Sequence, residues 1–366
     1  MAAVLQRGGR GTALVLVLLL LLPLVLQPLG THWVRIADTC LLYVMLALGI
    51  NIVVGYAGLL DLGYVAFYAV GAYLFALLTS PHLAEQFVWV ANTFPAGLHA
   101  PWWLTLGLGA VLAAALGALL GLPTLKLRGD YLAIVTLGFG EIVRILINNL
   151  GHPVNITNGA KGLGQIDSIS LFGLDLGQPL VVGGFEIASV TLYYYLFFAL
   201  MLMTVIISHR LHRSRLGRAW MAIRDDEVAA EAMGIPTRNL KLLAFAIGAG
   251  FGGVAGTLFA AFQGFVSPEA FGLQESVLIV AMVVFGGIGH LRGVILGAVL
   301  LTALPEVLRY VVGPLQAMTD GRIDAGMLRP LLIALALLGT MLWRPSGLWP
   351  APEHGKSLPA RATVSS

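Results

Sequence analysis

The sequence predicts an all-α polytopic membrane protein of about ten transmembrane helices. Of its 366 residues, 58% are hydrophobic and only 11% are charged, whereas a soluble domain has about 25% charged residues. The apolar residues form runs that approach the roughly 20 residues a helix needs to cross a bilayer. Lysine and arginine gather in alternate connections between these runs. A chain of this composition has lipid as the solvent for much of its surface.

Ten apolar runs qualify or nearly qualify as spanning helices. In chain order they cover residues 12–29, 38–55, 60–79, 102–122, 131–150, 190–208, 240–262, 275–289, 293–312 and 327–344. Only a few residues around 55–58 separate the second run from the third, which indicates a tight or re-entrant connection. The first run follows Arg7 and Arg10, as in a secretory signal. Its exit lacks a small-residue cleavage pattern, so we expect a retained helix.

The distribution of basic residues gives the orientation, because cytoplasmic loops are enriched in lysine and arginine. With the N-terminus in the cytoplasm, the segment 209–241 and its seven basic residues fall inside. Ten crossings also return the polar tail 351–366 to the cytoplasm. Residues 1–350 then form the transmembrane domain, with long outer loops at 80–101 and 151–189. We therefore expect both termini to be cytoplasmic.

The inner segment 209–241 contains a predicted short helix over residues 218–233. Alanine, methionine, glutamate and arginine favour this helix, and Gly234 followed by Pro236 is a stop signal. Trp220, Ile223 and Ala230 share one apolar face. A capped helix that stands free of the membrane should have a partner on which to dock.

Polar residues inside the spans are candidates for a translocation path. Glu141 and Arg144 lie three residues apart, so they share a helix face, and Asn148 continues that face. They either line the path or form a structural ion pair. Asn51 and Tyr56 lie at the break after the second run, where exposed backbone groups bind small ions or zwitterions in transporters. Tight packing alone is the alternative there.

Glycines at a spacing of four residues predict two smooth ridges for close helix packing. Such ridges carry much of the packing between helices in lipid, where no hydrophobic drive brings helices together. The ridge residues are Gly248, Gly252, Gly256, Gly289, Gly293 and Gly297.

The sequence lacks the motifs of an enzyme. It has no H-E-x-x-H and no G-x-S-x-G. Gly355-Lys356-Ser357 resembles the end of a phosphate loop, but Pro350 occupies the position that requires glycine. Cys40 is the single cysteine, so no intrachain disulfide or thiolate metal cluster is possible. We expect no catalytic residue, no metal and no cofactor in this chain, and no nucleic-acid partner.

The inner segment resembles the cytoplasmic coupling loop of ABC importer permeases. Glu227, Ala229, Ala230 and Gly234 follow an E-x-A-A-x-x-x-G pattern, although Val228 departs from the usual E-A-A form. Nearly the whole chain resembles the LivM-type permeases of branched-chain amino acid importers. The resemblance is carried by LGINIVVGYAG (48–58), LRGDYLAIVTLGFGEIVR (127–144), TNGAKGL (157–163), GGIG (286–289) and RPSGLW (344–349).

This resemblance implies an ABC importer permease-like bundle with a cytoplasmic coupling helix, in a bacterial inner membrane. A second homologous permease would pair with it, and a periplasmic binding protein would deliver leucine, isoleucine or valine. Two ATPase subunits, which hold ATP and Mg²⁺, would grip the coupling residues Gly217, Arg218, Arg224, Glu227, Ala229, Ala230, Glu231 and Gly234.

Two other readings remain open. The same machine in a related form imports urea, short amides or other amino acids. A transporter of a different class, an ion-coupled secondary transporter, requires an acidic residue near the membrane midplane. Glu141 is the main candidate for that role.

Overall fold

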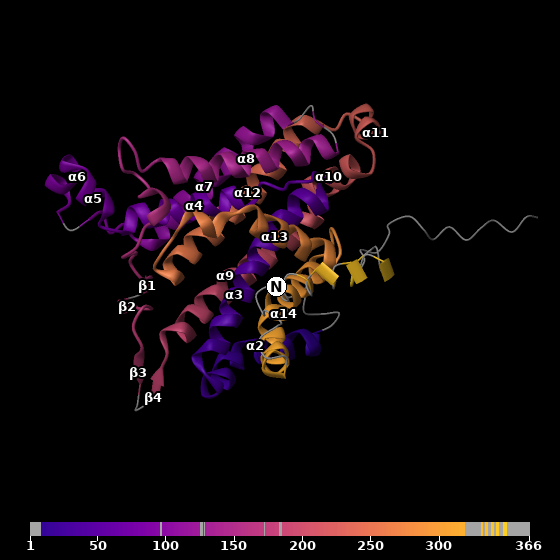
Figure 1. The fold of residues 1–366 in the computed structure, drawn as a ribbon. Helices are drawn as coiled ribbons and strands as arrows, with labels where there is room; N and C mark the ends of the chain where they lie inside the picture. The colour runs from indigo at the N-terminus through magenta and orange to yellow at the C-terminus, as the bar shows by residue number, and fades with distance from the viewer. Residues whose placement is uncertain are drawn as a thin grey trace, which may run out of the picture.

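The computed structural model is a helical bundle (Figure 1). It describes residues 9–318, apart from 96, 125, 126, 128, 172, 183 and 184, together with 331, 334, 335, 338, 339, 342, 343 and 347–349. The tenth predicted span, 327–344, is therefore described only at scattered positions. The tail 351–366 lies outside the described residues.

A helix lies on each of the first nine predicted spans. These are α2 (Gly9–Leu26), α3 (Thr31–Ile50), α4 (Val65–Thr79), α7 (Trp102–Thr124), α8 (Asp130–Asn149), α9 (Ser189–Arg213), α12 (Thr237–Gln263), α13 (Leu273–Gly286) and α14 (Leu291–Met318). By length and composition, four stretches of the described residues are long and apolar enough to cross a membrane: 31–56, 102–124, 189–213 and 237–263. The total of ten crossings stays a prediction.

The end of α3 is wound differently from the rest of the helix. Residues Asn51–Tyr56 form a π-helix, η2, which extends α3 to 26 residues. The connection from there to α4 covers residues 57–64, so it is longer than the sequence predicts. All six residues of η2 are buried.

Glycines bring α12 close to its neighbours α3, α4 and α7. Gly256 lies against the backbone of Tyr68 in α4, and Gly253 lies against the carbonyl of Gly109 in α7. A Cβ at either position would overlap those atoms. In the second ridge, Gly293 and Gly297 approach Gly286 and Met282 of α13 in the same way.

The prediction of a second helical ridge was wrong at one position. Gly289 lies in the turn between α13 and α14, with φ +82°. This left-handed conformation favours glycine, so the residue serves the turn and not a helix face.

The two outer segments contain more structure than loops. Residues 80–101 hold α5 (His82–Gln86) and α6 (Val88–Thr93). Residues 151–189 hold two antiparallel hairpins, β1 (Ser170–Leu171) with β2 (Leu174–Asp175), and β3 (Leu180–Val182) with β4 (Phe185–Ile187). The strictly all-α prediction was therefore wrong for this segment. Short 3₁₀ turns cover Gln27–Leu29, Gly159–Lys161 and Pro268–Phe271.

The predicted inner and outer segments occupy different ends of the bundle. Figure 1 shows α5, α6 and the strands at one end, and α10 (Arg215–Asp225) and α11 (Glu227–Ala232) at the other. The outer segment 151–189 is tied to the end of α12, because Leu163 and Val266 exchange backbone hydrogen bonds of 2.8 and 2.9 Å.

Candidate functional site

The inner segment folds into two helices instead of the predicted single helix over 218–233. The helix breaks at Asp226, whose backbone is extended (φ −156°, ψ 109°). Its Oδ1 accepts hydrogen bonds from the amides of Val228 (2.9 Å) and Ala229 (3.0 Å). Aspartate is a favoured N-cap because it satisfies the free amides of a first helical turn. The predicted stop is confirmed, since α11 ends at Ala232 and Gly234 has φ +82°.

One face of α10 and α11 is packed against the bundle. Trp220, Ile223 and Ala230 are all buried, which confirms the predicted apolar face. The Trp220 indole Nε1 donates to the carbonyl of Leu240, in the first turns of α12, at 2.7 Å. A buried indole needs such a partner, so this bond fixes how α10 docks on α12.

The start of α10 is packed on the end of α9. Ser214 caps α10 by accepting a hydrogen bond from the Gly217 amide at 3.2 Å. Gly217 is buried, and a Cβ there would overlap the carbonyl oxygens of Leu211 and His212. Arg218 is exposed and donates to the carbonyl of Arg213 at 3.0 Å. The chain therefore turns sharply from α9 into α10.

Glu227 is held by an ion pair within the chain. Its Oε1 lies 2.6 Å from Nζ of Lys241 in α12, and the Lys241 side chain is only 6% exposed. The Glu227 side chain is 26% exposed. Sequence reasoning missed Lys241 as a partner, because 14 residues and a helix break separate the two.

The rim of α11 that faces away from the bundle is exposed. It combines small, apolar and acidic side chains: Val228, Ala229, Glu231, Ala232, Met233 and Gly234. Met233 is 83% exposed. Large apolar side chains presented this way, beside a polar rim, are typical of protein contact surfaces.

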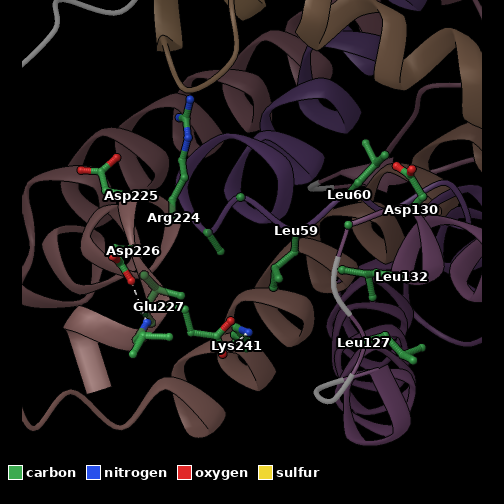
Figure 2. A pocket seen from close by; sticks show the side chains of 15 residues that line it. Leu59, Leu60, Leu127, Asp130, Leu132, Arg224, Asp225, Asp226, Glu227 and Lys241 are labelled. Atoms are coloured by element: carbon green, nitrogen blue, oxygen red, sulfur yellow. Dashed lines mark hydrogen bonds and ion pairs between the residues drawn. The ribbon is translucent and has the colours of Figure 1, made fainter. Parts of the chain in front are cut away.

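Arg224 is an exposed residue whose guanidinium group contacts the bundle. Its Nη1 donates to the carbonyl oxygen of Gly55, in the π-helical end of α3, at 2.5 Å. Figure 2 shows its side chain extended away from Glu227 and Lys241. The sequence predicts Arg224 only as part of the surface for an ATPase. Its contact with Gly55 was not predicted, because the two residues are 169 positions apart.

Asn51 and Tyr56 are buried where α3 ends. Asn51 Oδ1 accepts a hydrogen bond of 2.9 Å from the amide of Gly289, in the α13–α14 turn. The Tyr56 hydroxyl lies 3.4 Å from the hydroxyl of Ser208, and its ring lies 4.9 Å from the ring of His212. In this conformation both residues join helices, and their predicted place on a path stays a prediction.

The α13–α14 turn is further ordered by His290. Its Nδ1 accepts a hydrogen bond from the Gly293 amide at 3.2 Å, and its ring stacks on Trp349 at 6.2 Å. Burial, with the neighbouring Arg292 cation, lowers the pKa of His290 below its ordinary value. A neutral imidazole is the form that accepts through Nδ1, so the lowered pKa and the hydrogen bond agree.

A cleft of about 370 Å³ opens beside Arg224 and the ion pair of Glu227 with Lys241 (Figure 2). Its walls come from the α3–α4 connection, the α7–α8 connection and the α10–α11 corner. The charged side chains that line it are Asp130, Arg224, Asp225, Asp226, Glu227 and Lys241.

On α8, Glu141 and Arg144 form the pair that their spacing allows. Arg144 donates to Glu141 Oε2 from Nε (2.9 Å) and Nη2 (2.8 Å). The side chains are 30% and 36% exposed, and Asn148 is also exposed. Ile142 and Ile145 beside them are exposed too. Charges that face lipid are costly, so this surface is suited to a partner or a water-filled path.

Two acidic residues, Asp38 and Asp61, are buried in the bundle. Asp38 in α3 is fully buried, and neither of its carboxyl oxygens has a hydrogen-bond partner among the described residues. Asp61, in the α3–α4 connection, accepts from the Gly63 amide at 2.9 Å. Sequence reasoning missed Asp38, although an acidic residue at the first position of a predicted span was the available signal.

Most of the chain matches one known protein family. Residues 33–342 match the family described as the permease component of the branched-chain amino acid transport system. The chain belongs to this permease family. The predicted resemblance is therefore confirmed over most of the chain.

Named relatives agree with this assignment. The permease is 43% identical over 329 residues to the high-affinity branched-chain amino acid transport system permease protein LivM of Escherichia coli K12, covering 87% of this chain and 70% of the relative. LivM of Salmonella typhimurium gives the same identity and coverage. LivH of E. coli K12 is 26% identical over 321 residues, covering 86% and 93%. No solved structure matches the chain.

Proposed function

We propose that this permease is the transmembrane subunit of an ATP-driven importer that moves leucine, isoleucine and valine across a bacterial inner membrane. The observation that carries the proposal is the match to the branched-chain amino acid permease family over residues 33–342. The 43% identity to proteins named for high-affinity branched-chain amino acid transport supports the substrate class.

A second, homologous permease completes the pathway in this proposal. The relatives include both LivM and LivH permease proteins, and each matches more than four fifths of this chain. The exposed α8 face with Glu141, Arg144 and Asn148 fits such an interface, because a partner shields the ion pair from lipid. Substrate then passes between the two permeases, along this face.

Two ATPase subunits that hold ATP and Mg²⁺ supply the energy from the cytoplasm. The exposed rim of α11, with Val228 and Met233, is the surface we assign to their docking. A periplasmic binding protein delivers substrate to the segments 80–101 and 151–189 at the other end (Figure 1). Ten crossings with both termini in the cytoplasm give this sidedness.

Uptake of radiolabelled leucine and of urea, in cells with and without the gene, tests the proposal. We expect deletion to abolish leucine uptake alone, and depletion of ATP to do the same. Loss of urea uptake with unchanged leucine uptake would mean that the permease belongs to the same kind of ATP-driven importer but carries urea. Leucine uptake that requires this gene but follows the proton gradient would overturn the ATP-driven mechanism in favour of an ion-coupled carrier.

A further inference from the structure

The hydrogen bond from Arg224 joins two parts of the permease that the sequence keeps far apart. Arg224 is in the last turn of α10, beside the exposed rim assigned to the ATPase subunits. Its acceptor, the carbonyl of Gly55, belongs to a helix whose residues 44–56 are all buried. The guanidinium thus links a surface helix directly to the core.

The carbonyl of Gly55 is available because the helix ends one residue later, at Tyr56. In an α-helix this oxygen would accept from the amide of Leu59, four residues later. Here the Leu59 amide donates to Val53 at 3.0 Å, and the Ala57 amide donates to Ile52 at 3.2 Å. The last carbonyls of a helix need partners from outside, and a charged donor makes a strong one.

Two glycines make room for the Arg224 side chain. A Cβ at Gly58 would lie 2.8 Å from Arg224 Cγ, and one at Gly289 would lie 2.8 Å from Arg224 Nη1. Both glycines have positive φ, +70° and +82°. The α3–α4 connection is therefore shaped around the aliphatic stem of Arg224, and the α13–α14 turn around its guanidinium group.

The same turn is bonded to the end of α3. Asn51 Oδ1 accepts from the Gly289 amide at 2.9 Å, so Arg224, the π-helix and the α13–α14 turn form one closed junction. We name these residues, Asn51, Gly55, Gly58, Arg224 and Gly289, the α3 junction. Two further polar contacts of α10 and α11, Trp220 with Leu240 and Glu227 with Lys241, run to α12 instead.

We propose that Arg224 is a positioning residue that transmits movement of α10 and α11 to α3 and to the α13–α14 turn. It acts through the α3 junction and contacts neither the ATPase subunits nor the substrate. The inference rests on the proposed function, because the ATPase subunits impose the movement. A displacement of α10 pulls on the π-helical end of α3. This end packs against α12, and the body of α3 packs against α9, α12, α13 and α14.

The test uses the complete transporter in proteoliposomes, with its binding protein and leucine. The variants are Arg224→Gln and Arg224→Lys, and the control is Arg215→Gln, an exposed arginine on the same helix. Assembly, ATP hydrolysis and leucine taken up per ATP hydrolysed are measured for each. The amount of leucine taken up per ATP hydrolysed distinguishes a role in transmitting movement from a purely structural role.

We expect both Arg224 variants to assemble and hydrolyse ATP near the wild-type rate. Leucine uptake per ATP should fall about tenfold or more, the scale expected when a hydrogen bond to a charged group is lost. Lysine should not rescue it, because its shorter side chain ends in a compact ammonium that does not reach the position of Nη1 at the Gly55 carbonyl. Arg215→Gln should match wild type.

Two outcomes overturn the inference. One is a wild-type ratio of uptake to hydrolysis in Arg224→Gln. The other is loss of ATPase assembly in both Arg224 variants, which would make Arg224 a docking residue. Failure of the proposed function is distinct, since the wild-type complex itself would then hydrolyse ATP without leucine uptake.

Discussion

Gly55 occupies a position where a side chain does not fit. A Cβ there would overlap Asn51 Oδ1 and lie 2.9 Å from the backbone amide of Gly289. Overpacking a buried site typically costs about 1–3 kcal/mol. We expect Gly55→Ala to lower the midpoint of thermal unfolding of the purified permease in detergent. The matched control is Gly107→Ala, where no atom lies within 4 Å of the added Cβ.

Alanine in a helix interior is favoured over glycine by about 1 kcal/mol, so Gly107→Ala in α7 should raise the midpoint. Equal midpoints for Gly55→Ala and wild type would show that the α3 junction accommodates the added Cβ with no loss of stability.

The Glu141–Arg144 pair is expected to serve transport more than stability. Both side chains are about a third exposed, and exposed pairs contribute up to about 1 kcal/mol. We expect the double variant Glu141→Gln/Arg144→Gln to unfold within about 1 kcal/mol of wild type. Leucine uptake by the same variant should fall strongly. Normal uptake with a large loss of stability would favour the structural ion pair.

At the scale of elements, the ion pair of Glu227 in α11 with Lys241 in α12 can be tested by exchanging the two charges. Glu227→Lys places two cations together, one of them on the buried Lys241. Breaking a buried pair costs about 3–5 kcal/mol, and the exposure of Glu227 reduces this. We expect Glu227→Lys to destabilise the permease and Glu227→Lys/Lys241→Glu to restore most of the loss. Thermal unfolding of the three proteins measures this.

Transport by the exchanged pair reports on the coupling role that the sequence predicts for Glu227. If an ATPase subunit also contacts this carboxylate, the folded double variant should still take up little leucine per ATP. Wild-type uptake by the double variant would confine Glu227 to its ion pair with Lys241.

The elements that the sequence predicts well are those whose length the bilayer sets. The apolar runs locate α7, α8 and α12 within three residues at each end. The break at Asp226 was missed because helix propensity runs continuously through residues 218–233. The signal was the N-cap itself, an aspartate before Glu227 in the first turn of α11.

The sequence predicts which residues belong to the candidate site, but it does not predict most of the contacts between them. Glu227 and its neighbours were identified from their spacing, and the pairing of Glu141 with Arg144 follows from helix geometry. The α3 junction was not predictable. The hydrogen bonds of Asn51 and Arg224 span 238 and 169 residues, and the π-helical register of α3 depends on tertiary contacts that no local pattern encodes.

For the whole molecule, function requires that the two ends of the bundle face different compartments. The hairpins and α5–α6 occupy one end, and α10–α11 the other (Figure 1). In the proposed orientation these ends meet the binding protein and the ATPase subunits. Because α3 packs against helices throughout the bundle, a change at one end is carried through a connected core.

The single cysteine, Cys40, makes this sidedness measurable. It is buried in α3, so wild type should not react with a membrane-impermeant maleimide. In a Cys40→Ser background, Met233→Cys in the exposed turn after α11 and Leu174→Cys in the first hairpin place thiols at opposite ends.

With intact right-side-out spheroplasts, we expect Leu174→Cys to be labelled and Met233→Cys to be labelled only after permeabilisation. The positive-inside bias of residues 209–241 is the physical reason, since seven basic residues resist crossing the membrane. The reversed pattern would invert the orientation and place α11 out of reach of any cytoplasmic ATPase. Labelling of both thiols from outside would mean that the chain does not cross the membrane between residues 174 and 233. Among the described residues of that range, α9 is the helix long and apolar enough to span.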